Sequence, residues 1–398
     1  MRVVIDLLIA EKEPGGMLFA ARTLLEGLSH LESENEYIII TACPHIYQPM
    51  INAAARGTKI RTHAVRLFSW RGLLIQHQVI VPDILRRLKP DVLHVPSFVA
   101  PIGWHGPLVI TVHDLAFLRQ TPSLSLYTRL YWQSLLHESV RRAQKIIAIS
   151  ERTRVELMTF WHVPAERITV IHNAIRSSLA YSTVSPEHVQ AVRRRYGPRY
   201  LLHVGRIVPH KNVETLVLAF EALAARFPDL HLVLSGGAGL GSAAVLQMIE
   251  QSPYRKRIHQ PGWVADYDLG ILYAGADALV FPSHHEGFGL PTLEAMAFAT
   301  PVVASPTATS REVAGDAVLC VDCTHPKPLT DALSKLLTDA DLRTRLIEQG
   351  KQQMRMFSAE TCARATCRVY EQAVQHGGFV NDCYVASEQG DHKGSPLQ

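Results

Sequence analysis

Short apolar runs rich in β-branched residues alternate with longer segments of helical periodicity along most of the chain. This alternation is typical of βα units arranged around parallel sheets. In the first half, strands are predicted at 3–8, 37–41, 92–95, 108–111, 146–149 and 168–171. In the second half, they are predicted at 200–204, 231–235, 278–281, 301–304 and 318–321. The pattern therefore predicts two series of strands, each forming its own sheet.

A polar segment at 182–198 separates the two series and contains Pro186, Gly197 and Pro198. A chain of 398 residues also exceeds what one hydrophobic core usually serves. We therefore predict an α/β fold of two doubly wound domains, at 1–185 and 186–358. A further helical pattern covers 359–376, and the polar, glycine-rich stretch 377–398 is predicted to be a disordered tail.

The composition is that of a globular enzyme, with 47% hydrophobic and 19% charged residues. Asp6 interrupts the first apolar run, which therefore lacks the continuous core of a signal peptide. No apolar run approaches the roughly 20 residues that span a bilayer, and six cysteines in so long a chain indicate no disulfide framework. We expect a cytoplasmic protein.

The net charge of +4 is too small to favour a nucleic-acid partner. Basic residues cluster locally at 86–89, 141–145 and 193–195. Each cluster is interpreted as a solvated helix face. The alternative is peripheral contact with the inner membrane surface, where each basic residue adds about 1 kcal/mol of attraction to anionic lipid.

A loop with two cations follows the strand predicted at 200–204. It reads Gly205-Arg206-Ile207-Val208-Pro209-His210-Lys211-Asn212 and leads into a helical pattern. Backbone N–H groups and the helix dipole attract anions at such a position, and Arg206 and Lys211 add full charges. The loop therefore suits a diphosphate, although a solvated turn with Asn212 as N-cap accounts equally well for the loop alone.

A glycine turn bracketed by two carboxylates follows the strand predicted at 278–281. Glu286 and Glu294 flank this turn, in which Gly287 and Gly289 allow close backbone approach to a ligand. Pro291 suits the first turn of the helix that follows. Carboxylates at such positions accept hydrogen bonds from sugar hydroxyls, including those of a ribose. The alternative roles are a helix-dipole partner for Glu294 and an exposed loop acid for Glu286.

The Gly-Arg and Lys-Asn pairs followed by Glu-x7-Glu resemble the retaining nucleotide-sugar glycosyltransferases of family four, which have the GT-B fold of two Rossmann-like domains facing across a deep cleft. The likeness runs from residue 1 to about 374 and implies that the helix at 359–376 packs back toward the first domain. It also implies that Arg206 and Lys211 hold the donor diphosphate, that Glu294 binds the ribose and that Glu286 binds the transferred sugar. The donor-binding residues that it implies are Gly15, Gly16, Arg206, Lys211, Trp263, Val264, Glu286, Gly287, Phe288, Gly289, Leu290 and Glu294.

The likeness also implies which part of the donor each group contacts. Phe288, Gly289 and Leu290 approach the donor through their backbone, and the nucleotide base lies near 260–264, beside Trp263. The glycine pair Gly15-Gly16 faces the diphosphate from the first domain, with a flexible turn as the alternative.

In the first domain, His113 stands where the family has a functional histidine, and it would contact the transferred sugar, while Asp114 orients the loop. Ser150 and Asn173 also match family positions near the cleft, with structural roles as the alternative. Ala174 replaces the glycine usual after that asparagine, so close backbone approach there is in doubt.

Several other motifs are assigned structural roles. The Asp266-Tyr267-Asp268 segment precedes a helical pattern and is interpreted as helix capping instead of a metal-binding D-x-D motif. The glycine-rich stretch 236–241 misses the dinucleotide spacing and is interpreted as a close-approach loop in the donor cleft. The cysteines lack the partner spacing of a zinc site, and the adjacent pair His284-His285 rarely ligates one metal. We predict neither a metal nor a cofactor.

The predicted reaction moves a hexose from a nucleotide-diphosphate donor to a glycan or lipid-linked acceptor, and the family likeness implies retention of anomeric configuration. Preorganised charge from Arg206 and Lys211 stabilises the departing diphosphate. His113 and Glu286 are the candidates at the reacting carbon. The chain, including Thr-Val-His-Asp-Leu at 111–115 and Ile-Val-Pro-His-Lys-Asn at 207–212, resembles bacterial mannosyltransferases of cell-surface polysaccharide assembly. This resemblance makes GDP-mannose the first expectation for the donor.

Other functions stay open at this point. UDP-glucose or another UDP-sugar is the alternative donor, and a sugar phosphorylase or nucleotide-sugar epimerase is the alternative enzyme on this fold. A nicotinamide oxidoreductase and a non-catalytic sugar-binding protein fit the paired motifs less well. The acceptor wall is expected in loops of the first domain, at 70–78 and 117–127.

Overall fold

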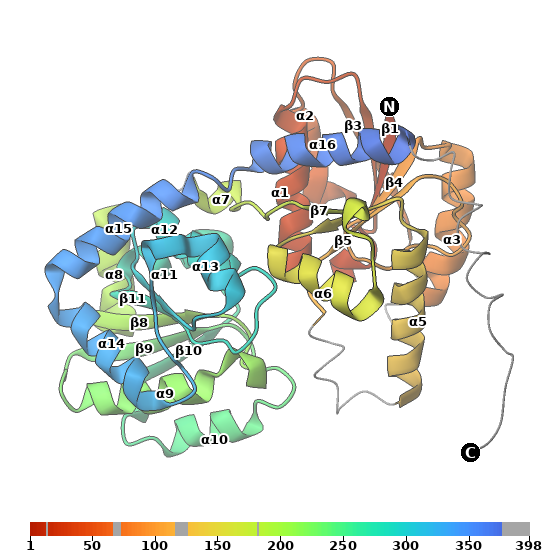
Figure 1. Ribbon diagram of the computed structural model, residues 1–398. Helices are drawn as coiled ribbons and strands as arrows, with labels where there is room; N and C mark the ends of the chain where they lie inside the picture. The colour runs from red at the N-terminus through yellow and green to blue at the C-terminus, as the bar shows by residue number, and fades with distance from the viewer. Residues whose placement is uncertain (13–14, 67–72, 116–125, 181–182, 376–398) are drawn as a thin grey trace, which may run out of the picture.

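The computed structural model describes residues 1–12, 15–66, 73–115, 126–180 and 183–375 (Figure 1). Within these ranges the chain forms two wholly parallel sheets, one in each lobe. The seven-stranded sheet has the order β3-β2-β1-β4-β5-β6-β7 and the six-stranded sheet the order β10-β9-β8-β11-β12-β13. The prediction of two doubly wound α/β domains is therefore confirmed. The predicted tail at 377–398, the expected acceptor loop at 117–125 and residues 70–72 of the other lie outside the described residues.

The strands begin and end as follows. In the first sheet they are β1 (Arg2–Asp6), β2 (Glu36–Thr41), β3 (Lys59–Ala64), β4 (Val92–Val95), β5 (Leu108–Val112), β6 (Lys145–Ala148) and β7 (Ile168–Val170). In the second they are β8 (Arg199–Val204), β9 (Leu230–Ser235), β10 (Ile258–Gly262), β11 (Ala278–Phe281), β12 (Val302–Ala304) and β13 (Val318–Cys320).

Two strands, β3 and β10, are absent from the sequence prediction, and each lies at an edge of its sheet. Of the six residues of β3 only Ile60 is buried, so the strand lacks the apolar run that marks the central strands. The strand β10 contains Pro261 and ends at Gly262, residues that are tolerated at a sheet edge but lower the strand propensity of a sequence.

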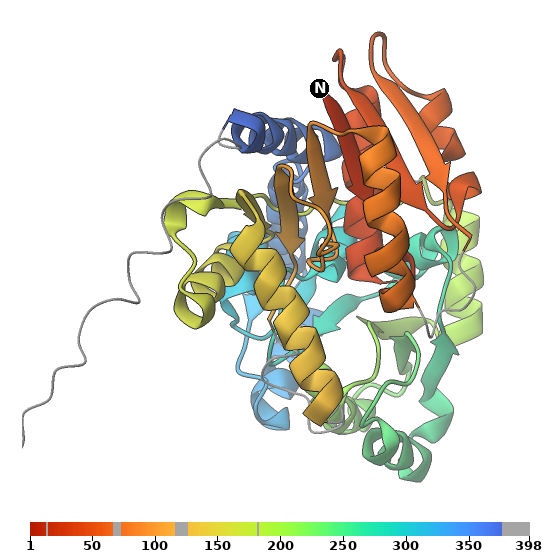
Figure 2. The same ribbon diagram turned by 90° about the vertical axis from the view of Figure 1, so that its right-hand side faces the viewer.

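Helices cover both faces of each sheet (Figures 1 and 2). Those of the first domain are α1 (Gly16–His30), α2 (Gln48–Asn52), α3 (Leu73–Leu88), α5 (Leu126–Arg142) and α6 (Glu151–Trp161). The second contains α8 (Pro186–Tyr196), α9 (Val213–Ala224), α10 (Ala243–Gln251), α11 (Asp266–Gly275), α12 (Leu290–Ala297), α13 (Ala308–Ala314), α14 (Pro326–Thr338) and α15 (Ala340–Met354). The short helix α7 (Ser177–Ala180) lies on the connection between the domains and packs on α11 and α12 of the second. The last helix is α16 (Ala359–Gln375).

The helix α16 returns from the second lobe and packs on α1 of the first (Figure 1). Its buried residues Val369 and Tyr370 belong to the same apolar cluster as the first-domain sheet. The approach is close at Gly27, where an added Cβ atom would lie 2.1 Å from the carbonyl oxygen of Ala359. The chain therefore passes between the lobes twice, before α8 and again before α16.

These two connections touch each other. The backbone N–H of Ile175, on the first connection, donates to the carbonyl oxygen of Phe357, on the second, at 3.2 Å. The lobes are thus joined by two adjacent segments of chain at one place.

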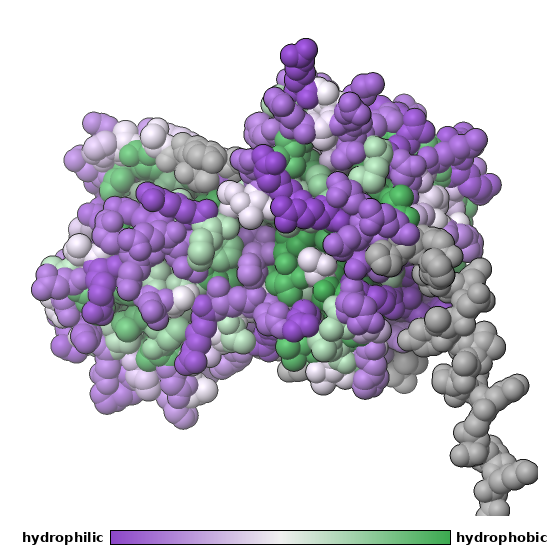
Figure 3. Space-filling model, turned by 45° about the horizontal axis from the view of Figure 1, so that its top comes forward, coloured by the Kyte–Doolittle hydropathy of each residue, from purple (hydrophilic) through white to green (hydrophobic). Residues whose placement is uncertain are grey.

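None of the helices in the described ranges combines the length and the apolarity needed to cross a bilayer. On the face seen in Figure 3, hydrophilic residues predominate and the hydrophobic ones form small, scattered groups.

The strand orders also place the binding edge of each sheet. Successive strands change direction across the sheet between β1 and β4 in the first domain and between β8 and β11 in the second. Ligands of open α/β sheets bind at such switch points, outside the carboxyl ends of the strands. The predicted Gly15-Gly16 pair lies where the segment after β1 enters α1, and the cationic loop and the glycine turn follow β8 and β11.

Candidate functional site

The predicted cation and acid of the second domain are in direct contact. Lys211 Nζ donates to Glu286 Oε1 at 2.5 Å, and both side chains are largely buried, at 17% and 13% exposed. Because β8 and β11 are neighbours in the sheet, the loops after them run side by side. The backbone N–H of His284 also donates to the carbonyl oxygen of His210, which ties the two loops together.

Asn212 anchors the cationic loop instead of capping the helix. It lies at the N-cap position of α9 with a φ of 53° and makes no side-chain cap hydrogen bond. Its Nδ2 donates to the carbonyl oxygens of Pro282, at 3.2 Å, and Cys323, at 2.7 Å. Its Oδ1 accepts from the Thr215 hydroxyl. Asn212 therefore holds the N-cap position that the alternative gives it, but its side chain is buried and ties the loop after β8 to the loops after β11 and β13.

The glycine-rich loop 236–241 packs on the backbone beside Arg206. A Cβ atom on Gly236 would lie 2.1 Å from the carbonyl oxygen of Gly205. Ile207 and Ala238 form a parallel β-bridge between the two loops. The glycines thus serve loop packing beneath Arg206, whose side chain is exposed.

Glu294 is buried, only 3% exposed, and both of its oxygens have partners. Oε1 accepts from Arg176 Nε at 3.0 Å and from the same guanidinium at 2.7 Å, and Oε2 accepts from the Tyr273 hydroxyl at 2.8 Å. Burial and the nearby Glu294 raise the pKa of Tyr273 well above its ordinary value. The helix that carries Glu294 starts after Gly289, which has a φ of 93°, and Pro291 lies in its first turn as the sequence predicts.

Arg176 is a residue that sequence reasoning missed. Its guanidinium also donates to Asp266 Oδ1 at 2.5 Å, and Asp266 Oδ2 accepts from the Ser178 hydroxyl at 2.9 Å. The capping interpretation of Asp266 is therefore wrong: Ala265 holds the N-cap position of α11 without a side-chain bond, and the carboxylate is turned toward Arg176. The one feature of the sequence that could have pointed to this residue is its position two residues after the Asn173-Ala174 turn.

The same guanidinium connects the second domain to α1. Its central carbon lies 4.3 Å from the centre of the Phe19 ring, in the first turn of α1. Gly15 occupies the N-cap position of this helix and Gly16 is its first residue. The predicted glycine pair therefore lies about one helical turn from the Glu294 cluster, across the junction of the domains.

His113 meets the glycine turn through its backbone. A Cβ atom on Gly287 would lie 2.3 Å from the carbonyl oxygen of His113 and 3.1 Å from the Cβ of Asp114. The ring Nε2 of His113 pairs with the carbonyl oxygen of Pro96 at 3.0 Å, and burial lowers the pKa of the ring. The described loops after β5 and β11 thus bring His113 and Gly287 together across the junction.

A second bridge between the domains lies beside this contact. Arg152, in the first turn of α6, donates to His285 Nδ1 at 2.5 Å. Burial, and secondarily the charge of Arg152, lower the pKa of His285. Ser150 caps α6 by accepting from the backbone N–H of Thr153 at 3.2 Å, so its visible role is structural.

A third bridge joins α13 to the first domain. Glu312 Oε1 accepts from the backbone N–H of Glu151 and from His172 Nε2, each at 2.7 Å. The His172 ring also packs on Phe288 and Phe357, with centroids 5.9 and 5.5 Å away. The Phe288 side chain is therefore buried at the junction of the domains. Only the backbone of Phe288 remains for a ligand to contact, together with that of Gly289 and Leu290.

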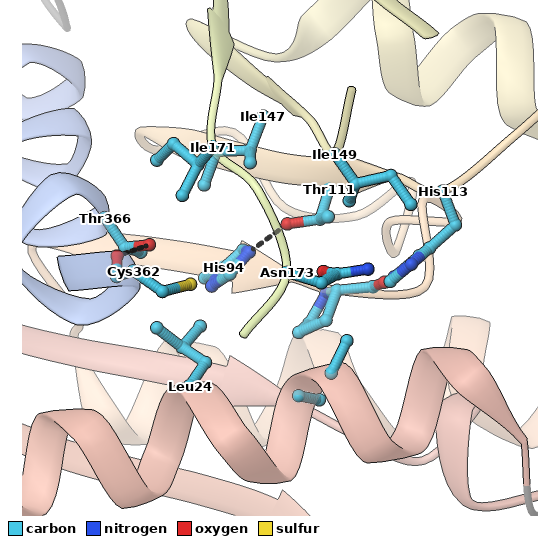
Figure 4. Close-up of a pocket in the computed structure, with 13 residues that line it drawn as sticks. Leu24, His94, Thr111, His113, Ile147, Ile149, Ile171, Asn173, Cys362 and Thr366 are labelled. Carbon is cyan, nitrogen blue, oxygen red and sulfur yellow. Dashed lines mark hydrogen bonds between the residues drawn. The ribbon is translucent and has the colours of Figure 1, made fainter. Parts of the chain in front are cut away.

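A small cavity of about 30 Å³ lies between α1, α16 and the first sheet (Figure 4). Its lining includes His113 and Asn173, together with the buried His94. Both ring nitrogens of His94 are paired, with the hydroxyls of Tyr370 at 2.8 Å and Thr111 at 2.9 Å. The space suffices for a water molecule but not for a sugar.

Trp263 lies apart from this constellation. Its side chain is 66% exposed and lines a groove of about 380 Å³ between α8 and the start of α11. Val264 lines the same groove, whereas Lys211, Glu286 and Glu294 do not. A contact of these two residues with a nucleotide base stays a prediction.

Within the described parts of the chain, no group of three or more His, Cys, Asp or Glu residues is arranged to hold a metal ion. The cysteines there are unpaired thiols, and burial raises the pKa of Cys323 to about 11. The chemistry that the described site offers is thus a buried cation and acid pair, an exposed cation and a second buried carboxylate, at the junction of two Rossmann-like domains.

Known proteins resemble this chain over both domains. Residues 184–353 match the family model of glycosyl transferases group 1, and residues 14–179 match that of glycosyltransferase family 4. The O-antigen chain mannosyltransferase B of Escherichia coli is 33% identical over 295 residues, which cover 72% of this chain and 76% of that protein. The O-antigen chain mannosyltransferase RfbU of Salmonella typhimurium is 27% identical and covers 57% of this chain, with 60% of its own length matched.

Among solved structures, Anabaena HepE in complex with UDP-glucose superposes with a TM-score of 0.72 at 18% identity, over 93% of this chain and 99% of that one. At this identity the likeness shows the fold alone, which is GT-B. The family models match both domains, and the Escherichia coli relative is similar over most of the chain. The chain therefore belongs to glycosyltransferase family 4.

Proposed function

We propose that this glycosyltransferase moves mannose from GDP-mannose to a glycan or lipid-linked acceptor of a cell-surface polysaccharide, with retention of anomeric configuration. The choice of sugar rests on the two O-antigen chain mannosyltransferases that match the chain. The assignment of roles rests on one observation, the contact of Lys211 with Glu286 at the switch point of the second sheet.

The reaction requires stabilisation of a departing diphosphate. Lys211 supplies a largely buried cation whose charge is little screened, and Arg206 supplies a second cation on the same loop. Such fixed charge is usually the largest catalytic contribution, since it needs no reorganisation as negative charge develops. Arg206 and Lys211 are the diphosphate-binding pair in this proposal.

Glu286 accepts hydroxyl groups of the transferred sugar, and His113 contacts the same sugar from the first domain. The pairing of Glu286 with Lys211 keeps the carboxylate in place next to the diphosphate. The acceptor attacks from the face that the leaving group vacates, and a donor phosphate oxygen takes its proton. Glu294 binds the ribose, and the backbone of 287–290 approaches sugar and phosphates.

A thermal-shift panel of nucleotide sugars tests the donor. The panel contains GDP-mannose, UDP-glucose and their free nucleotides, because a donor at 100 times its Kd stabilises the fold by about 2.7 kcal/mol. We expect GDP-mannose and GDP to raise the unfolding temperature. Stabilisation by UDP-glucose and not by GDP-mannose would show that the donor is a UDP-sugar and not GDP-mannose.

Product analysis tests the reaction. We expect a new glycoside whose anomeric proton keeps the configuration of the donor in an NMR spectrum. Free sugar phosphate would indicate a phosphorylase and an epimerised donor an epimerase, whereas an inverted anomer or a covalent sugar on Glu286 would rule out front-face attack.

A further inference from the structure

The guanidinium of Arg176 is the central group of a charge cluster at the junction of the domains. Only 8% of the residue is exposed, and its partners are Glu294, Asp266 and the ring of Phe19. Arg176 belongs to the connection that follows β7, while the two carboxylates lie on α12 and α11 of the second domain. Burial opposes the charge of Arg176, but the two carboxylates outweigh it and raise the pKa of the guanidinium.

The contacts leave Glu294 with little room for a ligand. A carboxylate offers about four acceptor positions, two on each oxygen. Within the described residues Oε1 accepts two N–H groups of Arg176 and is therefore filled. Oε2 accepts the Tyr273 hydroxyl, which leaves it one position.

We propose that Arg176 is a positioning residue for donor recognition. It holds the Glu294 carboxylate in one orientation, in which Oε2 accepts a single ribose hydroxyl instead of both. This inference rests on the donor role of Glu294 proposed above, and it adds the residue that directs the carboxylate and the number of hydroxyls that it binds.

The geometry suits arginine and not lysine. Two N–H groups of the planar guanidinium bind one carboxylate oxygen while a third reaches Asp266, and the flat face lies on Phe19. A lysine ammonium group is a point charge and lacks the planar, fixed N–H groups of a guanidinium. A lysine would therefore keep the positive charge but would no longer hold the Glu294 carboxylate in one orientation. Without arginine or lysine at this position, the buried Glu294 carboxylate would keep the Tyr273 hydroxyl but lose its counter-charge.

Binding of GDP and of its 2′-deoxy and 3′-deoxy forms to Arg176→Lys tests the proposal, with UDP and its deoxy forms run in parallel. In the wild type, removal of one of the two hydroxyls should weaken binding roughly 10- to 100-fold, the worth of a hydrogen bond to a charged group, and removal of the other should weaken it less than about threefold. In Arg176→Lys, binding of the ribonucleotide should fall by a similar factor, while the sensitive deoxy form should bind as it does to the wild type.

Two further variants separate the possible results. Arg255→Lys is the control, since Arg255 pairs with Glu250 in an exposed ion pair, and it should keep the full discrimination. Glu294→Gln tests the proposed function itself. If Glu294→Gln leaves nucleotide binding and discrimination unchanged, the donor role of Glu294 fails.

Loss of binding in Glu294→Gln together with full discrimination in Arg176→Lys would overturn the role of Arg176 alone. Tighter binding in Arg176→Lys would also overturn it, because Arg176 would then compete with the nucleotide. Equal sensitivity of the wild type to both hydroxyls would overturn the single-hydroxyl geometry. Thermal unfolding of each variant, run beforehand, shows that the compared proteins are folded.

Discussion

The carbonyl oxygen of His113 lies 2.3 Å from the place that a Cβ atom on Gly287 would occupy. Real Cβ atoms do not approach a carbonyl oxygen so closely, so only glycine allows the two domains to meet at this point. The close approach of the lobes around the proposed reaction centre therefore depends on residue 287 being a glycine.

Gly287→Ala should hold the domains apart. We expect a turnover loss of about 10²-fold, the effect of a misplacement of about 1 Å between reacting groups, and a larger radius of gyration by small-angle X-ray scattering. Gly103→Ala is the matched control, since its Cβ atom would meet only the Pro82 side chain, at 3.0 Å, on an exposed loop. Full activity in Gly287→Ala would show that this contact is not needed for catalysis.

Lys211→Ala should lower kcat by about 10²- to 10³-fold, because it removes fixed positive charge from the departing diphosphate. The fold should survive, as judged by circular dichroism. Lys351→Ala removes a comparable ion pair, with Glu348, where both side chains are at least half exposed, and should leave kcat unchanged. A folded Lys211→Ala protein with wild-type turnover would contradict the assignment.

Asn212→Ala should destabilise the second domain by about 2–4 kcal/mol, the sum of a lost buried hydrogen-bond partner and the strain of a left-handed residue. Asn212→Gly keeps the left-handed backbone without strain and should lose only the side-chain hydrogen bonds to Pro282, Cys323 and Thr215. Urea unfolding measures both. Equal stability of the two variants would show that the positive φ of Asn212 costs alanine nothing.

Stability should fall as the solution becomes more acidic. Burial lowers the pKa of His94 to about 3 and that of His203 to about 4. Both histidines are therefore neutral in the folded chain down to these pH values. Below the ordinary histidine pKa of about 6.5, the unfolded chain binds protons that the folded chain does not. Each histidine then lowers the free energy of unfolding by up to about 1.4 kcal/mol for each pH unit. The free energy of unfolding should therefore be greatest above pH 6.5 or so and decrease toward pH 5.

His94→Gln should reduce the slope of stability against pH, measured by urea unfolding between pH 7 and pH 5. His105→Gln, at an exposed histidine, should keep the wild-type slope. An unchanged slope in His94→Gln would mean that the unfolded chain takes up no extra proton at this residue.

Much of the fold follows from the sequence because burial leaves a clear pattern. The central strands of both sheets are apolar runs covered on both faces, so their positions and the split into two domains are evident. Edge strands such as β3 and β10 are only partly covered and lack that pattern, and the sequence prediction missed both.

The sequence places Lys211 and Glu286 on loops after two predicted strands, and their contact follows because those strands, β8 and β11, are neighbours in the sheet. The roles of these residues stay predictions. Arg176 is different, because it lies on the connection between the domains and is separated from Glu294 by 118 positions of sequence. The orientation of Asp266 depends on the same long-range pairing, so local capping rules pointed to the wrong partner.

The hydrogen bond between Ile175 and Phe357 holds the two connections between the lobes side by side. Two adjacent connections at one place can serve as a hinge, so we expect the lobes to open and close by rotation about this point. A protease cut in the second connection would leave the lobes joined covalently through the first. A cut in the first would leave them held by α16, which is continuous with the second lobe and packs on α1, so a protein cut at either connection should elute as one particle in gel filtration.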